Sequence, residues 1–192
     1  HMTDKVSVVH NGIIENFREI RYALRTEGAE SSSETDTEVV APLITSEMRK
    51  GDGPIAATGR ALKKLRGAFA LAIIFAGHDD LMIGAREGSP LAVGHGDGEM
   101  YLGSDAIALA PFTSQITYLE EGDWAILHRG GVEFRADGRR DLARHGRRHG
   151  EIRPALGSLD VGVDRVFDRG IECHAVDGVL GVAMLLADRP RQ

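Results

Sequence analysis

Cysteine and long apolar runs are nearly absent from this chain, and each absence excludes a class of protein. Cys173 is the single cysteine among 192 residues, which rules out an internal disulfide and fits a reducing cytoplasm. No segment approaches the ~18 consecutive apolar residues of a membrane-spanning helix, and no secretory signal is recognisable. We therefore expect a cytoplasmic protein with no membrane partner.

Excess positive charge is also lacking. The formal net charge is −6, so the chain as a whole does not have the electrostatics of a nucleic-acid-binding protein. One local run is basic, with arginine at positions 139, 140, 144, 147 and 148. We interpret this run as a solvated segment, and contact with an anion is the alternative.

Aliphatic residues provide the material for a core. Apolar residues make up 42% of the chain and aromatic residues 5%, and the length suits one good domain. A β-branched run at residues 6–9 predicts a strand that stops on His10-Asn11-Gly12. The apolar residues that follow have the three-to-four spacing of an amphipathic helix: Ile13, Phe17, Ile20 and Leu24.

The remaining pattern separates helices from strands. Two further helices are predicted within residues 34–51 and over residues 54–65. Short strand candidates then follow one another, divided by Gly, Asp and Pro: 69–75, 81–86, 91–94, 100–104, 116–120 and 124–128. This order predicts an α+β fold with antiparallel hairpins rather than alternating βαβ units.

The composition changes near residue 140. Residues 141–192 contain no lysine and many arginines, glycines and histidines, and only residues 179–187 are convincingly apolar. We therefore divide the chain into a domain at residues 1–140 and a tail at residues 141–192. The tail reads either as a frame change in a GC-rich gene or as an unrelated fusion, which sequencing of the source gene distinguishes.

Two short motifs have chemical potential. Asn11 and Gly12 combine a side-chain amide with an adjacent backbone N–H, the donor pair of many oxyanion holes, and a plain turn is the alternative. Asp36 lies among hydroxyl and carboxylate residues at a predicted helix start. It is either part of a capping box or a carboxylate that binds the ammonium group of an amino acid.

Other reactive residue types fit chemistry less well. His145 and His149 have helical spacing for zinc and would need His174 or Cys173 as a further ligand, but glycines and arginines weaken that helix. Ser89 and Ser104 lack the context of a nucleophile elbow, so we assign them turn or pocket roles. We predict no metal site and no cofactor.

Six segments taken together resemble a known family. They are VVHNGIIENF, SETDTEV, LRGAFAL, AREGSPLAVG, LGSDAIAL and YLEEGD, in this order between residues 8 and 123. At these separations they are similar to the glutaminase domain of glutamine–fructose-6-phosphate aminotransferases (glucosamine-6-phosphate synthases). These enzymes are class II glutamine amidotransferases, which are N-terminal-nucleophile hydrolases. The resemblance covers about residues 5–138.

The resemblance implies a fold and residue roles. It implies an αββα sandwich of two antiparallel sheets, partial here and without its N-terminal strands, with glutamine as substrate. Asn11, through its side chain, and Gly12, through its N–H, match the oxyanion hole, and Asp36 matches the acid that binds the α-amino group of glutamine. Residues 88–90 and 104–105 match family loops to which we assign no role.

The sequence also departs from the family. The nucleophile of these enzymes is an N-terminal cysteine, and this chain begins at His1. The family's Thr-Arg-Trp-Ala-Thr-His-Gly stretch, which grips the substrate carboxylate, is absent too, so we read the domain as N-terminally truncated. Cys173 lies in the unmatched tail and is no substitute. We therefore expect a relative of the enzymes that supply ammonia to fructose 6-phosphate, itself inactive as a glutaminase.

Two alternatives stay open. Exposed strand edges and apolar surface would suit a non-catalytic module that forms a homo-oligomer or binds another protein. A recruited hydrolase would instead use another nucleophile, or a metal bound by His145, His149 and His174.

Overall fold

The computed structural model describes residues 1–28, 35–136, 150–151, 161–167, 171–176 and 182–187, and beyond residue 136 it describes the strand backbone alone. Its helices are α1 (Phe17–Thr26), the 3-10 helix η1 (Thr37–Val39), α2 (Val40–Arg49), α3 (Pro54–Leu62) and α4 (Ala106–Leu109). Its first eight strands are β1 (Val6–Ile14), β2 (Gly67–Phe75), β3 (Met82–Glu87), β4 (Ala92–His95), β5 (Glu99–Gly103), β6 (Gln115–Tyr118), β7 (Asp123–His128) and β8 (Gly131–Ala136). Four more follow: β9 (Gly150–Glu151), β10 (Val161–Phe167), β11 (Ile171–Val176) and β12 (Val182–Ala187).

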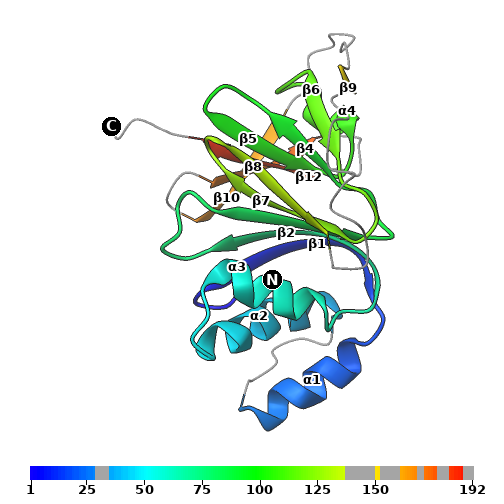
Figure 1. Ribbon diagram of the computed structural model, residues 1–192, viewed down its shortest axis with the longest axis vertical. Helices are drawn as coiled ribbons and strands as arrows, with labels where there is room; N and C mark the ends of the chain where they lie inside the picture. The colour runs from blue at the N-terminus through cyan, green and yellow to red at the C-terminus, as the bar shows by residue number, and fades with distance from the viewer. Residues whose placement is uncertain (29–34, 137–149, 152–160, 168–170, 177–181, 188–192) are drawn as a thin grey trace.

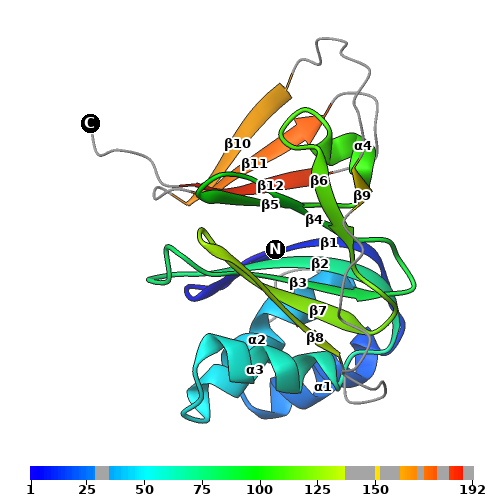
Figure 2. The same ribbon diagram turned by 45° about the horizontal axis from the view of Figure 1, so that its top comes forward.

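Three layers stack in the molecule. Helices α1, α2 and α3 lie under one sheet, and a second sheet lies over the opposite face of the first (Figures 1 and 2). The first sheet has the order β1-β2-β3-β7-β8, and the second has the order β10-β11-β12-β5-β4-β6-β9. All of the described pairings are antiparallel. The predicted α+β fold with antiparallel sheets is therefore confirmed.

Two apolar layers follow from this stacking. One lies between the helices and the first sheet and includes Ile44 and Leu71. The other lies between the two sheets and includes Ile74 and Leu102. Because β2 supplies alternate side chains to both layers, it has no solvent-facing side. That burial explains the uninterrupted apolar run at residues 69–75.

Strand β1 differs from the prediction. It does not stop at Asn11-Gly12 but continues to Ile14, and all nine of its residues pair with β2. Helix α1 therefore begins at Phe17 rather than at Ile13. Ile13 is 63% exposed while Ile14 is fully buried, which is the alternation of a strand. Long-range pairing with β2 has overridden a local helical spacing.

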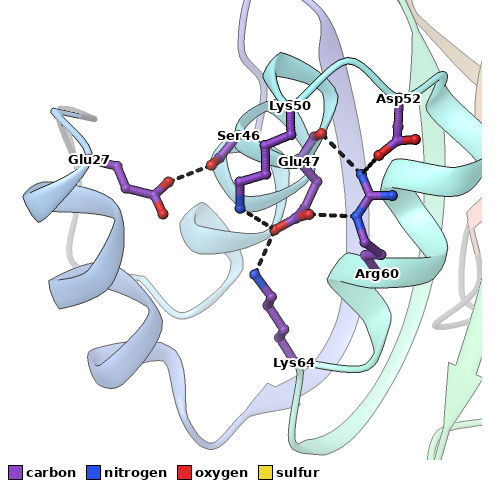
Figure 3. Close-up of polar contacts among 7 residues, drawn as sticks. All are labelled: Glu27, Ser46, Glu47, Lys50, Asp52, Arg60 and Lys64. Atoms are coloured by element: carbon purple, nitrogen blue, oxygen red, sulfur yellow. Dashed lines mark hydrogen bonds and ion pairs between the residues drawn. The ribbon is translucent and has the colours of Figure 1, made fainter.

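Helices α2 and α3 are joined by a buried carboxylate (Figure 3). Glu47 of α2 accepts hydrogen bonds from Arg60 Nε at 2.8 Å, Lys50 Nζ at 2.9 Å and Lys64 Nζ at 2.6 Å. Arg60 also pairs with Asp52 in the loop between the helices. This cluster fixes the helix layer at the end of α2.

The other elements largely agree with the sequence pattern. The six predicted strands from residue 69 onward correspond to β2–β7, and the helix predicted at residues 54–65 ends at Leu62. Strand β8 and the short helix α4 were not predicted. Within the described residues, every helix is too short or too polar to cross a membrane.

Candidate functional site

The outer edge of β1 carries the candidate site. Ala76 donates its N–H to Lys5 O at 2.9 Å, and Glu15 donates to Arg66 O at 2.8 Å, one pair at each end of the β1–β2 ladder. Paired residues in an antiparallel ladder alternate between bonded and non-bonded pairs. The odd-numbered residues of β1 therefore bond β2, and the N–H of Gly12 points away from β2 toward the edge of the sheet.

Gly12 has a packing role that is independent of chemistry. Its φ is +122°, and a Cβ at this position would lie 2.1 Å from Ala68 O. Any other residue would both strain the backbone and collide with β2. The neighbouring Asn11 is exposed and pairs with Ala70. It lies on the same face of β1 as Val9, which packs in the layer between the sheets.

Asp36 reaches β1 rather than its own helix. It occupies the N-cap position of η1 but makes no capping hydrogen bond, so the capping interpretation does not apply to its side chain. Its Oδ2 instead accepts the backbone N–H of Ile14 at 2.8 Å. Within the described residues, Oδ1 accepts no hydrogen bond. The structure thus brings the Asp36 carboxylate to the same strand edge as the Gly12 N–H.

Sequence analysis missed a second contact between these segments. The Nδ1 atom of His10 lies 2.8 Å from the Thr37 hydroxyl. The other ring nitrogen, Nε2, is buried and has no hydrogen-bond partner among the described residues. Burial lowers the pKa of His10 below its usual 6.5, and the negative charge of Asp36 partly opposes that shift. The sequence offered one hint of this contact, which is that His10 and Thr37 are the chain neighbours of the predicted site residues Asn11 and Asp36.

The other segments that resemble the family make hydrogen bonds that stabilise the fold. The Asn16 side chain donates to Lys64 O at 2.8 Å and accepts the N–H of Arg66 at 2.9 Å, which joins the start of α1 to the start of β2. Asp105 caps α4 by accepting the N–H of Ala108 at 2.9 Å.

A further tie joins the AREGSP and YLEEGD segments. Arg86 donates to Leu119 O at 2.5 Å and pairs with Glu121 at 3.3 Å. Glu121 also accepts the N–H of Gly88 at 2.6 Å. Both serines considered as nucleophiles lie in bends, Ser89 after β3 and Ser104 before α4.

The metal hypothesis falls mostly outside the described residues. His145, His149 and the basic run at residues 139–148 lie there. Cys173 and His174 are on β11, of which only the backbone is described. Among the described side chains, no group of three His, Cys, Asp or Glu residues is arranged to hold a metal ion.

A known protein family has the sequence pattern of this chain. The family model for a glutamine amidotransferase domain matches residues 1–111. The chain belongs to this family. The resemblance predicted from the six segments is thereby confirmed.

Curated relatives in the family are glutamine–fructose-6-phosphate aminotransferases. The protein from Mesorhizobium japonicum is 62% identical over 141 residues, which cover 73% of this chain and 23% of the relative. The protein from Brucella abortus is 56% identical over 144 residues, which cover 75% of this chain and 24% of the relative. The chain thus spans about a quarter of the length of these relatives.

Solved amidotransferase structures share the fold. Glutamine phosphoribosylpyrophosphate amidotransferase from B. subtilis aligns with a TM-score of 0.59 at 26% identity, covering 70% of this chain and 30% of that chain. A glutamine aminotransferase class-II domain protein from Silicibacter pomeroyi aligns with a TM-score of 0.53 at 19% identity, covering 68% and 66%. The N-terminal-nucleophile-hydrolase type of α+β fold is therefore confirmed.

Proposed function

We propose that residues 1–140 hold the half of a glutaminase site that binds the α-ammonium group of glutamine and stabilises the oxyanion. In an aminotransferase like the curated relatives, such a site would supply glutamine-derived ammonia for transfer to fructose 6-phosphate. The observation that carries the proposal is the hydrogen bond between Asp36 Oδ2 and the Ile14 N–H, which joins the two segments that the family resemblance singles out.

The spacing along β1 supports a shared site. The N–H groups of Gly12 and Ile14 point to the same edge and lie two residues apart, roughly 7 Å along a strand. Asp36 is held at Ile14, which places a carboxylate at one end of this span and the Gly12 donor at the other. An extended amino acid with a side-chain amide bridges such a span, with its ammonium on Asp36 and its amide oxygen at Gly12.

The chemistry assigned to each group follows from charge. A carboxylate with one oxygen held by a backbone N–H can offer the other to an ammonium group as a charge-assisted hydrogen bond. The Gly12 N–H and the Asn11 amide carry no charge and suit the oxygen that becomes negative in a tetrahedral intermediate. We assign the covalent step to none of these three residues.

A polypeptide of residues 1–192 should therefore bind glutamine without hydrolysing it. Its single cysteine, Cys173, lies outside the part of the sequence that resembles the family. The decisive assay is glutamate release from glutamine by the purified chain, with Cys173→Ala as the matched control. Absence of release, together with glutamine binding that Asp36→Asn weakens at least tenfold, supports the proposal.

Two results would contradict it. Release that Cys173→Ala abolishes would assign the nucleophile to the tail. Glutamine binding that Asp36→Asn leaves unchanged would remove the ammonium-binding role of this carboxylate.

A second candidate function is self-association. Ile13 and Met2, both near the outer edge of β1, are 63% and 60% exposed, and an edge strand with apolar neighbours favours strand pairing between copies. Size-exclusion chromatography with light scattering tests this. A concentration-dependent dimer that Ile13→Lys abolishes supports it, and a monomer at all concentrations argues against it.

We also propose the boundary at residue 140, with residues 141–192 as an added segment that extends the second sheet through the pairing of β12 with β5 and of β9 with β6. The support is the change in composition at that point. A folded product from residues 1–140 alone would favour the boundary, and an unfolded one would contradict it. The alternative of metal chemistry at His145, His149 and His174 stays open, and metal analysis of the purified protein tests it. A cytoplasmic location stays a prediction.

A further inference from the structure

Two adjacent contacts fasten the start of η1 to β1. Thr37 reaches His10 Nδ1 at 2.8 Å, and Asp36 reaches the Ile14 N–H at 2.8 Å. His10 and Ile14 are four residues apart on the strand, and consecutive residues of the helical segment contact them. The two contacts therefore bracket Gly12, the proposed oxyanion donor.

The two contacts differ in what fixes them. Ile14 offers a backbone N–H, whose position is set by the β1–β2 ladder. The Asp36 side chain that accepts this bond can rotate unless its own backbone is held. The contact between His10 and Thr37 supplies that restraint one residue further along the chain.

The His10 ring is itself held by its surroundings. It is half-buried, its Nε2 atom is shielded from solvent, and the Nδ1–hydroxyl contact is the hydrogen bond that the described residues give it. A neutral ring with its N–H on Nδ1 can donate that hydrogen to the Thr37 hydroxyl, whereas the protonated ring also carries an N–H on the shielded Nε2, where no described acceptor lies. The ring therefore works as a neutral tether and not as an acid or base.

We propose that His10 is a positioning residue which, through Thr37, holds the Asp36 carboxylate in the orientation that receives the α-ammonium group of glutamine. This role rests on the proposed function for its ligand, but the tether itself has a readout of its own. That readout is the hydrogen-exchange rate of the Ile14 amide, because the Asp36–Ile14 bond must open before exchange occurs.

The experiment compares two substitutions at one site in the full chain. In His10→Asn the side-chain amide places a polar atom close to the position of Nδ1, whereas His10→Leu keeps bulk but no polar atom. We expect His10→Leu to speed Ile14 exchange at least tenfold and to weaken L-glutamine binding at least fivefold. His10→Asn should stay within twofold of the natural chain in both measurements. The amide of Ile73, a fully buried residue of the interior strand β2 of the same sheet, serves as the reference for global opening.

Thr37 tests the same contact from the other side. Thr37→Val preserves shape and removes the hydroxyl, so it should reproduce the effects of His10→Leu, while Thr37→Ser should not. The double variant His10→Leu/Thr37→Val should be no worse than either single variant, because both remove one interaction. If His10→Leu fails to fold, Thr37→Val carries the test.

Three results separate the possible failures. Unchanged Ile14 exchange in His10→Leu and Thr37→Val overturns the tether. Faster exchange with unchanged glutamine affinity, where Asp36→Asn does weaken affinity, overturns the link between tether and site. If Asp36→Asn has no effect on binding, the proposed function fails, whereas Ile14 exchange still decides whether His10 positions Asp36.

Discussion

Two carboxylates at opposite ends of one helical segment have contrasting surroundings. Asp36 stands at the start of η1, is half-buried, and receives one backbone N–H. Glu47 lies near the end of α2, is 2% exposed, and receives three cationic side chains (Figure 3). Both Glu47 oxygens accept hydrogen bonds from the protein, while one Asp36 oxygen accepts none from the described residues. A carboxylate with a full set of partners holds structure together, and one with a spare oxygen can serve a ligand.

The electrostatics of Glu47 agree with a structural role. Burial raises the pKa of its carboxyl group, but hydrogen bonds from Lys64, Arg60 and Lys50 outweigh burial and lower the pKa from its usual 4.5 to about 2. The charged form is therefore the one that the fold favours. No ligand is needed to satisfy it.

The largest expected effect is the loss of this charge. Glu47→Gln should lower the free energy of unfolding by about 3 kcal/mol, because the buried group then meets three cations without a compensating charge. Asp36→Asn should cost about 1 kcal/mol, since a neutral amide oxygen can still accept the Ile14 N–H. Urea denaturation measures both. Equal losses would remove the distinction between the two carboxylates.

The pH dependence of stability should follow Glu47. A carboxyl whose pKa is lowered in the folded state contributes fully above its unfolded pKa of about 4.5, and this contribution is lost as the pH falls toward about 2. The difference in stability between the natural chain and Glu47→Gln should therefore shrink across this range. A constant difference from pH 6 to pH 2 would show that Glu47 does not act through its charge. Glu19→Gln, which changes an exposed acid on α1, is the matched control.

Removing one cation should have an intermediate effect. Arg60→Ala should lower the melting temperature less than Glu47→Gln does but more than Lys50→Ala does, because Arg60 bonds the Glu47 side chain, the Glu47 main-chain oxygen and Asp52. Thermal unfolding of this variant beside Glu47→Gln measures the share that Arg60 carries. A smaller loss of stability in Arg60→Ala than in Lys50→Ala would contradict the expectation that Arg60 contributes more than Lys50.

The smallest effect is expected at Lys50. Its side chain is 49% exposed and pairs with Glu47 across one helical turn, and solvent screens the charge of so exposed a lysine, so the pair contributes little to stability. Lys50→Ala should therefore leave the melting temperature almost unchanged and should not alter glutamine binding. A large loss would mean that the three cations act as one cooperative unit.

Local pattern predicted much of the fold but little of the site. The run at residues 69–75 is apolar at every position, so strand β2 was recognisable from sequence alone. Ile13 was misassigned because its spacing to Phe17 and Ile20 is helical, and only pairing with β2 made it part of a strand. The family segments named Asn11, Gly12 and Asp36, but neither spacing nor propensity could show that Asp36 bonds the Ile14 N–H rather than capping η1.

The sequence by itself determined the order of helices and strands, the apolar content of the core strands and the membership of the amidotransferase family. These properties depend on residues close together in the chain, or on short segments that are each compared with the corresponding segment of the family. The tertiary structure alone decided that His10 meets Thr37 and that Asp36 reaches Ile14, across separations of 27 and 22 residues. Such contacts depend on how the sheet edge and the helix layer pack, because no local preference encodes the partner of a side chain that distant.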